Sequence, residues 1–335
     1  MMLNRKCKNC LISESYSDVK LNENKICNFC TTLKKDNDEE KRLMKKEFEE
    51  YIYEIKGKNV YDCVLLFSGG KDSIYLLYLL TKKYGLNVLT VTVDNDLETN
   101  LSKENIKKCI KFFNVNNLTV IPRNDFYKRL YKYIFKNKIE NGYSMSICPI
   151  CFGIINCIGL NIAAKKKIPI VLDASSPDQI RSGDYLNKNL LKKLDSLNVL
   201  ENPDFIKQDL NYFWDPKKYD IIPRFIKPFY FLEYPGVENI IKKLESLGLG
   251  QKKKFNPLST NCHMSWLSIY LDLKKYNDNM YIRNFHKLVR YGKINRLKWR
   301  IMLPIGIFLL KNRLIKRKQI NQAVKYIDLK LEDLL

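Results

Sequence analysis

The sequence predicts an α/β fold in which a parallel, doubly wound sheet follows a small cysteine-bearing module and precedes a mostly helical region. Between residues 58 and 174, short apolar runs alternate with helical patterns, as in repeated β-α-β units. Two Cys-x-x-Cys pairs lie within residues 1–32, and residues 237–335 show mainly helical patterns. We therefore predict a metal-binding module at 1–32, a connecting amphipathic helix at 33–57, an α/β domain at 58–235 and a helical basic region at 236–335.

The α/β region contains four predicted strands and four predicted helices. The strands cover 60–67, 87–93, 118–122 and 168–173, and the helices cover about 72–84, 101–113, 126–139 and 151–166. Apolar strands in such units form a parallel sheet that is covered by helices on both faces. Residues 175–235 contain six prolines among several aromatic residues, which predicts long ordered loops. Ligands bind beyond the carboxyl ends of parallel strands, so the candidate site lies there.

Charge and composition narrow the class of protein without deciding it. The 335 residues include 59 Lys and Arg against 36 Asp and Glu, a net charge of +23, and 45% are hydrophobic, which is ample for a packed core. A basic surface could attract nucleic acid, anionic lipid or phosphorylated substrates. A chain rich in Lys, Asn and Ile throughout would also be basic for compositional reasons alone. The basic stretch 287–318 could touch RNA, an anionic membrane surface or another subunit.

The sequence predicts a cytoplasmic protein without a transmembrane segment. Its first residues lack the apolar region of a signal peptide, and the apolar run 301–310 is about half as long as a bilayer-spanning helix. Peripheral contact with a membrane stays open. In a reducing compartment, ten cysteines indicate metal or catalytic roles rather than disulfides.

Residues 68–73 read Ser-Gly-Gly-Lys-Asp-Ser and stand between an apolar strand and a helix. Small residues at such a turn let backbone N–H groups close around a phosphate at the positive end of the helix. The pattern differs from the Walker and dinucleotide-binding glycine motifs. An ordinary glycine-rich turn is the alternative. The candidate nucleotide-binding residues of this loop are Ser68, Gly69, Gly70, Lys71, Asp72 and Ser73.

Charged residues in and near the loop have separate expected roles. Lys71 would offset phosphate charge, and Asp72 would coordinate Mg²⁺ or cap the following helix. Asp94 follows the second predicted strand, where a nucleoside would lie against the sheet edge; a turn aspartate is the alternative.

A polar segment follows the fourth predicted strand at the same edge of the sheet. Asp173 and Asp178 are candidates for contact with metal or substrate, and Arg181 could neutralise a phosphate or a carboxylate. A polar loop with a proline turn is the alternative reading.

Two cysteine pairs near the N-terminus have the spacing of a zinc ribbon. Cys7 and Cys10 form one Cys-x-x-Cys knuckle, and Cys27 and Cys30 form another after sixteen intervening residues. Two such knuckles can enclose a tetrahedral Zn²⁺ with four thiolates. A four-cysteine site is closed, so the metal would fold the module rather than catalyse.

A second group of cysteines lies in the α/β and helical regions. Cys148 and Cys151 form a Cys-Pro-Ile-Cys segment just before the fourth predicted helix, whose N-terminus would favour thiolates. Cys262 lies in a distant loop and could join them in a site with an open coordination position. Such a site could hold an iron–sulfur cluster, or a catalytic zinc with His263 nearby. A lone Cys262 could also be a small buried apolar residue.

The loop at residues 68–73 resembles the PP-loop of the ATP pyrophosphatase superfamily. The order of parts, with a Cys-x-x-Cys ribbon, Tyr-Asp-Cys-Val before the loop and Cys-Pro-x-Cys before Ile-Pro-Ile-Val, is most similar to the N-acetyl sugar amidotransferase family. Residues 288–294 also resemble that family. The resemblance implies cleavage of ATP to AMP and pyrophosphate, adenylation of an acetamido oxygen and attack by ammonia.

This resemblance also implies a set of partners. The acceptor would be a nucleotide-sugar or glycan-type substrate of polysaccharide biosynthesis. The ammonia would come from a separate glutaminase subunit. Catalytic roles would fall to Lys71, Asp72 and Asp178 together with the cysteines Cys148, Cys151 and Cys262.

Two other functions are compatible with the sequence. The chain also resembles tRNA-thiolating PP-loop enzymes, in which three cysteines hold a 4Fe-4S cluster that delivers sulfur, and tRNA would suit the charge of +23. However, the Gly-His-x-x-Asp-Asp-type segment of that branch is replaced here by residues 174–178. The third function is a non-catalytic zinc-ribbon module on a nucleotide-binding scaffold, against which the intact loop argues.

Overall fold

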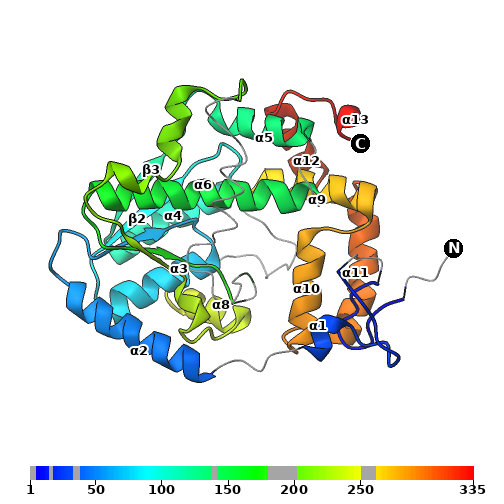
Figure 1. The fold of residues 1–335 in the computed structure, drawn as a ribbon, viewed down its shortest axis with the longest axis horizontal. Helices are drawn as coiled ribbons and strands as arrows, with labels where there is room; N and C mark the ends of the chain where they lie inside the picture. The colour runs from blue at the N-terminus through cyan, green and yellow to red at the C-terminus, as the bar shows by residue number, and fades with distance from the viewer. Residues whose placement is uncertain are drawn as a thin grey trace.

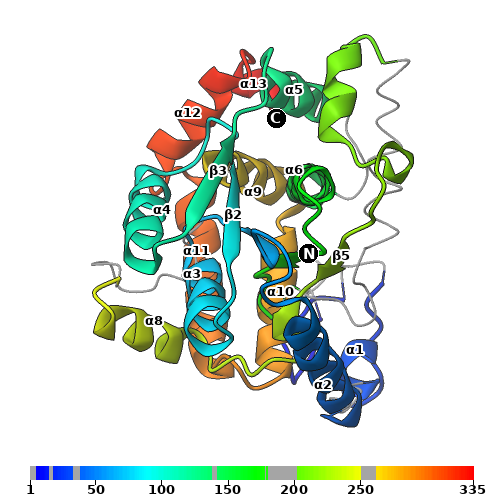
Figure 2. The same ribbon diagram turned by 90° about the vertical axis from the view of Figure 1, so that its left-hand side faces the viewer.

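The computed structural model describes residues 5–14, 18–32, 38–137, 142–177, 179, 202–249 and 262–335. Its centre is a five-stranded, all-parallel sheet with the strand order β3-β2-β1-β4-β5 (Figures 1 and 2). The strands are β1 (Cys63–Leu66), β2 (Val88–Val93), β3 (Asn116–Val120), β4 (Ile170–Asp173) and β5 (Arg224–Ile226).

The strand order places a topological switch point beside β1. The chain adds β2 and β3 on one side of β1, then crosses to the other side to add β4 and β5. Leu66 at the end of β1 pairs with Val91 of β2 and with Asp173 of β4. Connections that leave β1 and β4 in opposite directions open a crevice at the carboxyl ends of these strands, where ligands bind in doubly wound sheets.

Helices surround the sheet and form the region that follows it. The first group precedes or alternates with the strands: α1 (Asn28–Thr31), α2 (Asp38–Ile55), α3 (Lys71–Tyr78), α4 (Asn100–Phe113), α5 (Phe126–Lys136) and α6 (Tyr143–Lys165). The second group follows: α8 (Val237–Ser246), α9 (His263–Tyr276), α10 (Met280–Arg290), α11 (Arg296–Lys311), α12 (Arg317–Tyr326) and α13 (Leu331–Leu334). A π-helical turn at Leu79–Lys83 extends α3, and short 3₁₀ turns cover Lys207–Tyr212, Pro216–Lys218 and Pro228–Tyr230.

Alternate residues of β1 bury their side chains on opposite faces of the sheet. Val64 and Leu66 pack with Leu160 and Ala163 of α6. An added Cβ at Gly159 would lie 2.5 Å from Leu66 Cδ2, so the absence of a side chain there lets α6 approach β1 closely. On the other face, residues of α2, α3, α4 and α8 cover Cys63 and Leu65 in a second core. Figure 2 shows α6 and α4 on opposite sides of the strands.

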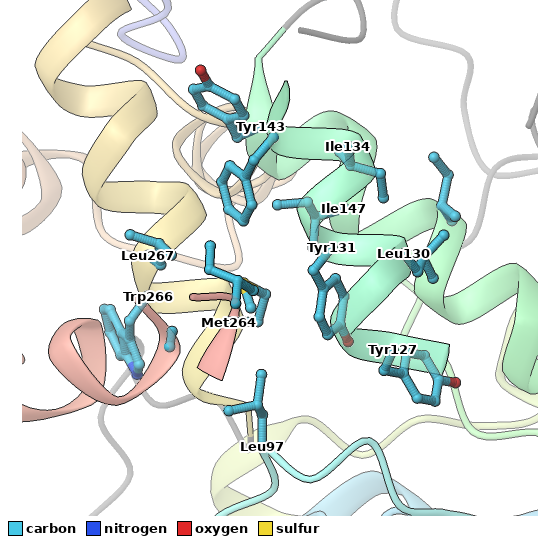
Figure 3. Packing of buried hydrophobic residues seen from close by; sticks show 14 of the residues in the cluster. Leu97, Tyr127, Leu130, Tyr131, Ile134, Tyr143, Ile147, Met264, Trp266 and Leu267 are labelled. Carbon is cyan, nitrogen blue, oxygen red and sulfur yellow. The ribbon is translucent and has the colours of Figure 1, made fainter. Parts of the chain in front are cut away.

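Helix α6 is buried on its outer side as well. There α5 and α9 cover it, and Figure 3 shows Tyr131, Ile147 and Leu267 meeting from the three helices. It is long and apolar enough to cross a membrane, but 72% of its apolar window is buried inside the fold. A helix that is hydrophobic all round is typical of a protein core. Residues 141–164 contain no charged side chain, so this apolar stretch is longer than the run 301–310 considered from the sequence.

The N-terminal module rests on the helical region that ends the chain. The Arg283 guanidinium of α10 forms an ion pair with Asp18, at 2.9 Å. About one helical turn further along α10, His286 Nδ1 lies 2.8 Å from the Cys10 carbonyl oxygen. Leu11 packs with Trp299 of α11 in a small separate core. These contacts join segments that are more than 260 residues apart in the sequence.

Most predicted elements are present, with two corrections. The predicted helix at 151–166 begins at Tyr143 instead, because its first turn is capped by a residue far away in sequence: Asp272 accepts hydrogen bonds from the backbone N–H groups of Tyr143 and Ser144 at 2.6 and 2.8 Å. Strand β5 was not predicted, because it is a three-residue edge strand within a proline-rich segment. The boundaries between domains stay a prediction.

The Asp62→Ala variant should unfold more easily than the wild type. Asp62 is buried, and its two carboxylate oxygens accept hydrogen bonds from the Gly57 and Asn87 backbone N–H groups at 2.6 and 2.7 Å. Removal loses both hydrogen bonds, each of which contributes roughly 0.5–1.5 kcal/mol to net stability. Urea unfolding followed by circular dichroism measures the loss, and the exposed Asp220→Ala variant serves as the control. Equal stability of the two variants would contradict the role of Asp62.

Candidate functional site

The Ser68–Ser73 loop turns directly from the carboxyl end of β1 into α3. Gly69 has φ +65°, and an added Cβ would lie 2.6 Å from the Ser102 carbonyl oxygen of α4, so both the backbone angle and the space require glycine. Gly70 is the N-cap residue of α3 and has an extended backbone. No side chain caps α3, which leaves its first N–H groups available to a phosphate.

Two polar side chains of α4 hold the backbone of this loop from behind. The Ser102 hydroxyl donates to the Ser68 carbonyl oxygen, and the Asn105 amide donates to the Gly69 carbonyl oxygen at 3.0 Å. Both residues are buried. Carbonyl oxygens that are satisfied by α4 cannot turn toward a bound anion, so the loop presents N–H groups and hydroxyls instead. The sequence motif alone did not indicate that α4 supports the loop.

Asp72 is held by two partners in the first turn of α3. Its Oδ2 lies 2.6 Å from Lys71 Nζ, and its Oδ1 accepts a hydrogen bond from the Tyr234 hydroxyl at 2.7 Å. The Asp72 carboxylate is therefore held next to the Ser68–Ser73 loop, beside the Lys71 ammonium group. Tyr234 lies in the proline-rich segment, and no sequence signal pointed to it.

Asp94 follows β2 and lies beside α4. Its Oδ2 is 2.7 Å from Lys103 Nζ, and its Oδ1 accepts a hydrogen bond from the Asp96 backbone N–H at 2.9 Å. The second contact is an Asx turn, which is the alternative role that the sequence left open for Asp94. The side chain thus stands at the carboxyl edge with one oxygen in a turn and one in an ion pair.

Asp173 ends β4 on the opposite side of β1 from Asp94. It is buried, accepts hydrogen bonds from the Ser175 backbone N–H and hydroxyl, and lies 3.8 Å from Lys227 Nζ. Burial raises the pKa of the Asp173 carboxyl above its ordinary value, although Lys227 and Ser175 act in the other direction. Lys227 was not a candidate from the sequence. The predicted site residues Asp178 and Arg181 lie outside the described part of the chain.

The four N-terminal cysteines gather as a metal site requires. Their sulfur atoms all lie within 4.8 Å of one another, with 3.8 Å between Cys7 and Cys30 and 3.6 Å between Cys10 and Cys27. Four thiolates placed tetrahedrally at a Zn–S distance of about 2.3 Å would be about 3.8 Å apart. Among the described residues, these four cysteines are the group of His, Cys, Asp and Glu side chains whose possible ligand atoms lie close enough together to hold a metal ion.

The surroundings of this four-cysteine site act on its sulfur atoms in opposite directions: hydrogen-bond donors favour the thiolate form, whereas burial raises the pKa of the Cys10 and Cys30 thiols. The Cys27 backbone N–H donates to Cys7 Sγ at 3.3 Å, and Arg290 of α10 lies 3.6 Å from Cys10 Sγ. Burial opposes ionisation of Cys7, but backbone N–H groups from Cys10, Cys27 and Asn9 lower the pKa of its thiol to about 7. A thiolate cluster beside a guanidinium and backbone donors fits a bound cation.

The structure brings Cys148, Cys151 and Cys262 into one cluster, which we call the three-cysteine cluster. Cys148 and Cys151 are one turn apart on α6, and Cys262 is the N-cap residue of α9. The buried Asn95 amide nitrogen bridges two of them, lying 3.9 Å from Cys151 Sγ and 3.7 Å from Cys262 Sγ. Because Asn95 follows Asp94, the cluster adjoins the carboxyl edge of β2.

Hydroxyl groups complete the surroundings of the three-cysteine cluster. The Tyr131 hydroxyl lies 3.3 Å from Cys151 Sγ, and the Tyr281 hydroxyl lies 3.2 Å from Cys148 Sγ. Ser265 Oγ is 3.8 Å from Cys148 Sγ. These four polar partners, including Asn95, come from α5, α9, α10 and the loop after β2, so the sequence could not group them. Among the described residues, the close spacing that a single metal ion needs is met by the four N-terminal cysteines and not by these three, so sulfur ligands with outer hydrogen-bond donors would suit an iron–sulfur cluster here instead.

The expectation that α6 favours thiolates at this cluster is wrong. Since α6 begins at Tyr143, Cys148 and Cys151 lie in its second and third turns rather than at its positive end. Burial raises the pKa of the Cys151 thiol to about 12 and that of Cys262 to about 11, and it also raises that of Cys148. Without a bound cation, all three thiols are therefore neutral near pH 7. A metal or cluster would have to displace their protons on binding.

The chain is similar to known proteins only over part of its length or at low sequence identity. No family model matches the chain. An uncharacterized protein from Methanocaldococcus jannaschii is 36% identical over 141 residues, which are 42% of this chain and 48% of that protein. The chain thus spans about half the length of the curated relative it matches.

Several solved structures are similar at low identity. A U34-tRNA thiolase from Methanococcus maripaludis with its 4Fe-4S cluster is 18% identical, with a TM-score of 0.36 over 88% of this chain and 90% of that one. An NH3-dependent NAD synthetase from Campylobacter jejuni is 14% identical, with a TM-score of 0.38 over 87% and 97%. An NMN synthetase from Francisella tularensis is 13% identical, with a TM-score of 0.33 over 76% and 94%. At these values the likeness assigns no activity to this chain.

The Cys10→Ser variant should lose metal and stability together. Loss of one of four thiolate ligands weakens metal binding, and the free energy of that binding contributes directly to folding of the module. We expect elemental analysis to show about one metal ion fewer per chain and thermal unfolding to begin earlier. Cys109→Ser, which changes a buried cysteine of α4, is the matched control and should keep its metal. Full metal content in Cys10→Ser would refute the site.

Replacing Asp173 with Asn should change how stability depends on pH. Because its pKa is raised in the folded protein, Asp173 contributes stability below the ordinary carboxyl pKa, and this contribution is lost as pH rises through the raised pKa. Thermal unfolding of Asp173→Asn should therefore lose less stability than the wild type between pH 4 and pH 8. Parallel pH profiles for the two proteins would contradict a raised pKa.

Proposed function

We propose that this protein is an ATP-dependent enzyme of the PP-loop class that forms AMP and pyrophosphate. The observation that carries the proposal is the placement of the Ser68–Ser73 loop. It follows the central strand of a parallel sheet at the topological switch point, opens an uncapped helix and has its carbonyl oxygens held by α4. Such a loop offers an anion N–H groups, two hydroxyls and one lysine.

The residues of the loop have distinct roles in this proposal. The amides of Gly69 and Gly70 and the hydroxyls of Ser68 and Ser73 bind the phosphates that leave as pyrophosphate. Lys71 offsets their charge, and Asp72 is the ligand for Mg²⁺. The ion supplies a Lewis acid that neutralises charge developing on the phosphates. Asp94 and Asp173, on either side of β1, face the nucleoside and the substrate.

The chemistry converts a poor leaving group into a good one. A carbonyl-type oxygen of the substrate attacks the α-phosphorus of ATP, and the bond to pyrophosphate breaks. The substrate oxygen is then part of an AMP ester. An incoming nucleophile forms a bond to the carbon, and AMP departs with the oxygen. Phosphates fixed at a helix N-terminus assist the first step, because negative charge grows there.

Nitrogen is our first candidate for the incoming atom. The order of sequence motifs supports an amidotransferase that converts the acetamido group of a nucleotide-sugar or glycan-type substrate into an acetamidine, a reaction of polysaccharide biosynthesis. Ammonia from a separate glutaminase is the nucleophile. We further propose zinc for the four-cysteine site, since its spacing and closed shell suit that ion.

Sulfur is the second candidate, because the three-cysteine cluster adjoins the same edge of the sheet. Three cysteines with hydrogen-bond donors around them could hold a 4Fe-4S cluster with one iron open to a sulfur atom. The acceptor would then be tRNA or a small molecule, and the basic surface would suit tRNA. The first step, in which the substrate oxygen is adenylated, is the same whether nitrogen or sulfur is the incoming atom.

Anaerobic purification followed by metal, iron and sulfide analysis separates these candidates. Zinc at one ion per chain without iron supports nitrogen transfer, whereas about four irons per chain with matching sulfide supports sulfur transfer. Pyrophosphate release is then measured with ammonium and an N-acetyl sugar nucleotide, or with tRNA and a sulfur donor. Release only with tRNA and sulfur would refute the amidotransferase. A protein that fails to bind ATP would be a non-catalytic module instead.

The Asp72→Asn variant should abolish pyrophosphate release and keep its fold. The neutral amide has the shape of the carboxylate but binds Mg²⁺ weakly, so we expect the rate to fall roughly a hundredfold or more. Tyr234→Phe, which removes only the hydrogen bond to Asp72, is the matched comparison and should lose roughly tenfold or less. Turnover by Asp72→Asn at the wild-type rate would remove Asp72 from the metal site.

A further inference from the structure

Helix α11 exposes a continuous apolar stripe to solvent. Leu297, Ile301, Ile305 and Phe308 are 63%, 64%, 54% and 60% exposed. Their spacing of four, four and three residues places them on one face of the helix. Figure 1 shows α11 at the edge of the molecule beside α10. Large apolar side chains gathered on one exposed face mark a surface that binds something.

The opposite face of α11 is already used by the fold. Trp299 packs with Leu11 and Val289, and Leu310 is buried in the core formed by α5, α6 and α9. The exposed stripe is therefore not the side of the helix that the protein itself needs for packing. Substitutions within the stripe should leave the fold intact.

The sequence that contains the stripe is strongly basic. Residues 279–327 contain thirteen Lys and Arg and no Asp or Glu. On α11, Lys298 and Arg300 are exposed and flank the stripe near its start. The first turn of the helix carries no acidic residue. A cation there opposes the helix dipole and costs about 0.3–1 kcal/mol, so these basic residues do not serve helix stability.

We propose that this face of α11 docks on an anionic bilayer surface. Leu297, Ile301, Ile305 and Phe308 enter the boundary between headgroups and acyl chains, as the apolar face of an interfacial helix does. Lys298 and Arg300 contact lipid phosphates, where each basic residue contributes to binding. The proposal is independent of the reaction catalysed at the Ser68–Ser73 loop.

Two other occupants fit the surface less well. RNA would pair with the basic residues, and Phe308 could stack on a base, but Leu297, Ile301 and Ile305 offer no stacking surface and would remain in water. A second copy of this chain would cover the stripe, but it would bring two sets of like charges together without a carboxylate between them. An anionic lipid surface offers acyl chains to the apolar stripe and phosphate groups to the basic residues.

Vesicle sedimentation tests the proposal with the full chain. Wild-type protein is mixed with vesicles of phosphatidylcholine alone or of phosphatidylcholine with 30% phosphatidylglycerol. We expect binding to the anionic vesicles that is at least roughly tenfold tighter and that weakens with added salt. The Ile301→Ser/Ile305→Ser/Phe308→Ser variant should bind at least roughly tenfold more weakly, because it cannot insert the stripe. Lys298→Gln/Arg300→Gln should lose roughly tenfold on anionic vesicles only.

The control changes apolar residues that are exposed elsewhere. Ile121→Ser/Ile222→Ser replaces side chains that are 62% and 68% exposed and lie outside α11, and it should bind like the wild type. Unchanged vesicle binding by the triple variant overturns the proposal. The proposal is also overturned if light scattering shows a dimer for the wild type and a monomer for the triple variant. It is overturned as well if the triple variant loses tRNA binding and the protein binds no vesicles. Pyrophosphate release by the triple variant should equal that of the wild type, which separates this proposal from the enzymatic one.

Discussion

The close packing of α6 against β1 is the contact on which the remaining structure depends. Gly159 lets the helix lie directly on Leu66, and the same helix carries Cys148 and Cys151 toward the carboxyl edge of the sheet. Its outer side supports α5 and α9, so the core of the helical region is built on it. A larger residue at 159 would collide with the Leu66 side chain, so either that side chain or the helix would have to shift.

The sheet edge gathers groups of opposite character around one crevice. On the β1 side, the loop offers N–H groups, hydroxyls and Lys71 for an anion. On the β2 side, Asn95 links the edge to the three-cysteine cluster, while on the β4 side the buried Asp173 forms an ion pair with the partly buried Lys227. Parallel strands make this convergence a matter of topology, because every strand ends at the same edge.

Features that depend on local sequence spacing were predictable, and features that depend on contacts between distant segments were not. The alternation of strands and helices, the phosphate loop and the four-cysteine site follow from local spacing, so the sequence predicts them. The start of α6 does not, because the residue that caps it, Asp272, is 128 residues away in the sequence. The partners Lys227, Tyr234 and Asn95 come from segments without a motif, and only the folded chain brings them to the site.

The contact between Cys10 and His286 ties the chain into a ring, since the two partners are 276 residues apart in the sequence. A metal ion in the adjacent four-cysteine site would bind only within the N-terminal module, so it would stabilise this closure indirectly, by folding the module that carries Cys10. Closing so long a loop has an entropy cost that grows only slowly with length. Loss of the ion would therefore weaken the contact of α10 and α11 with the module, while the sheet, which has its own core, would keep its shape.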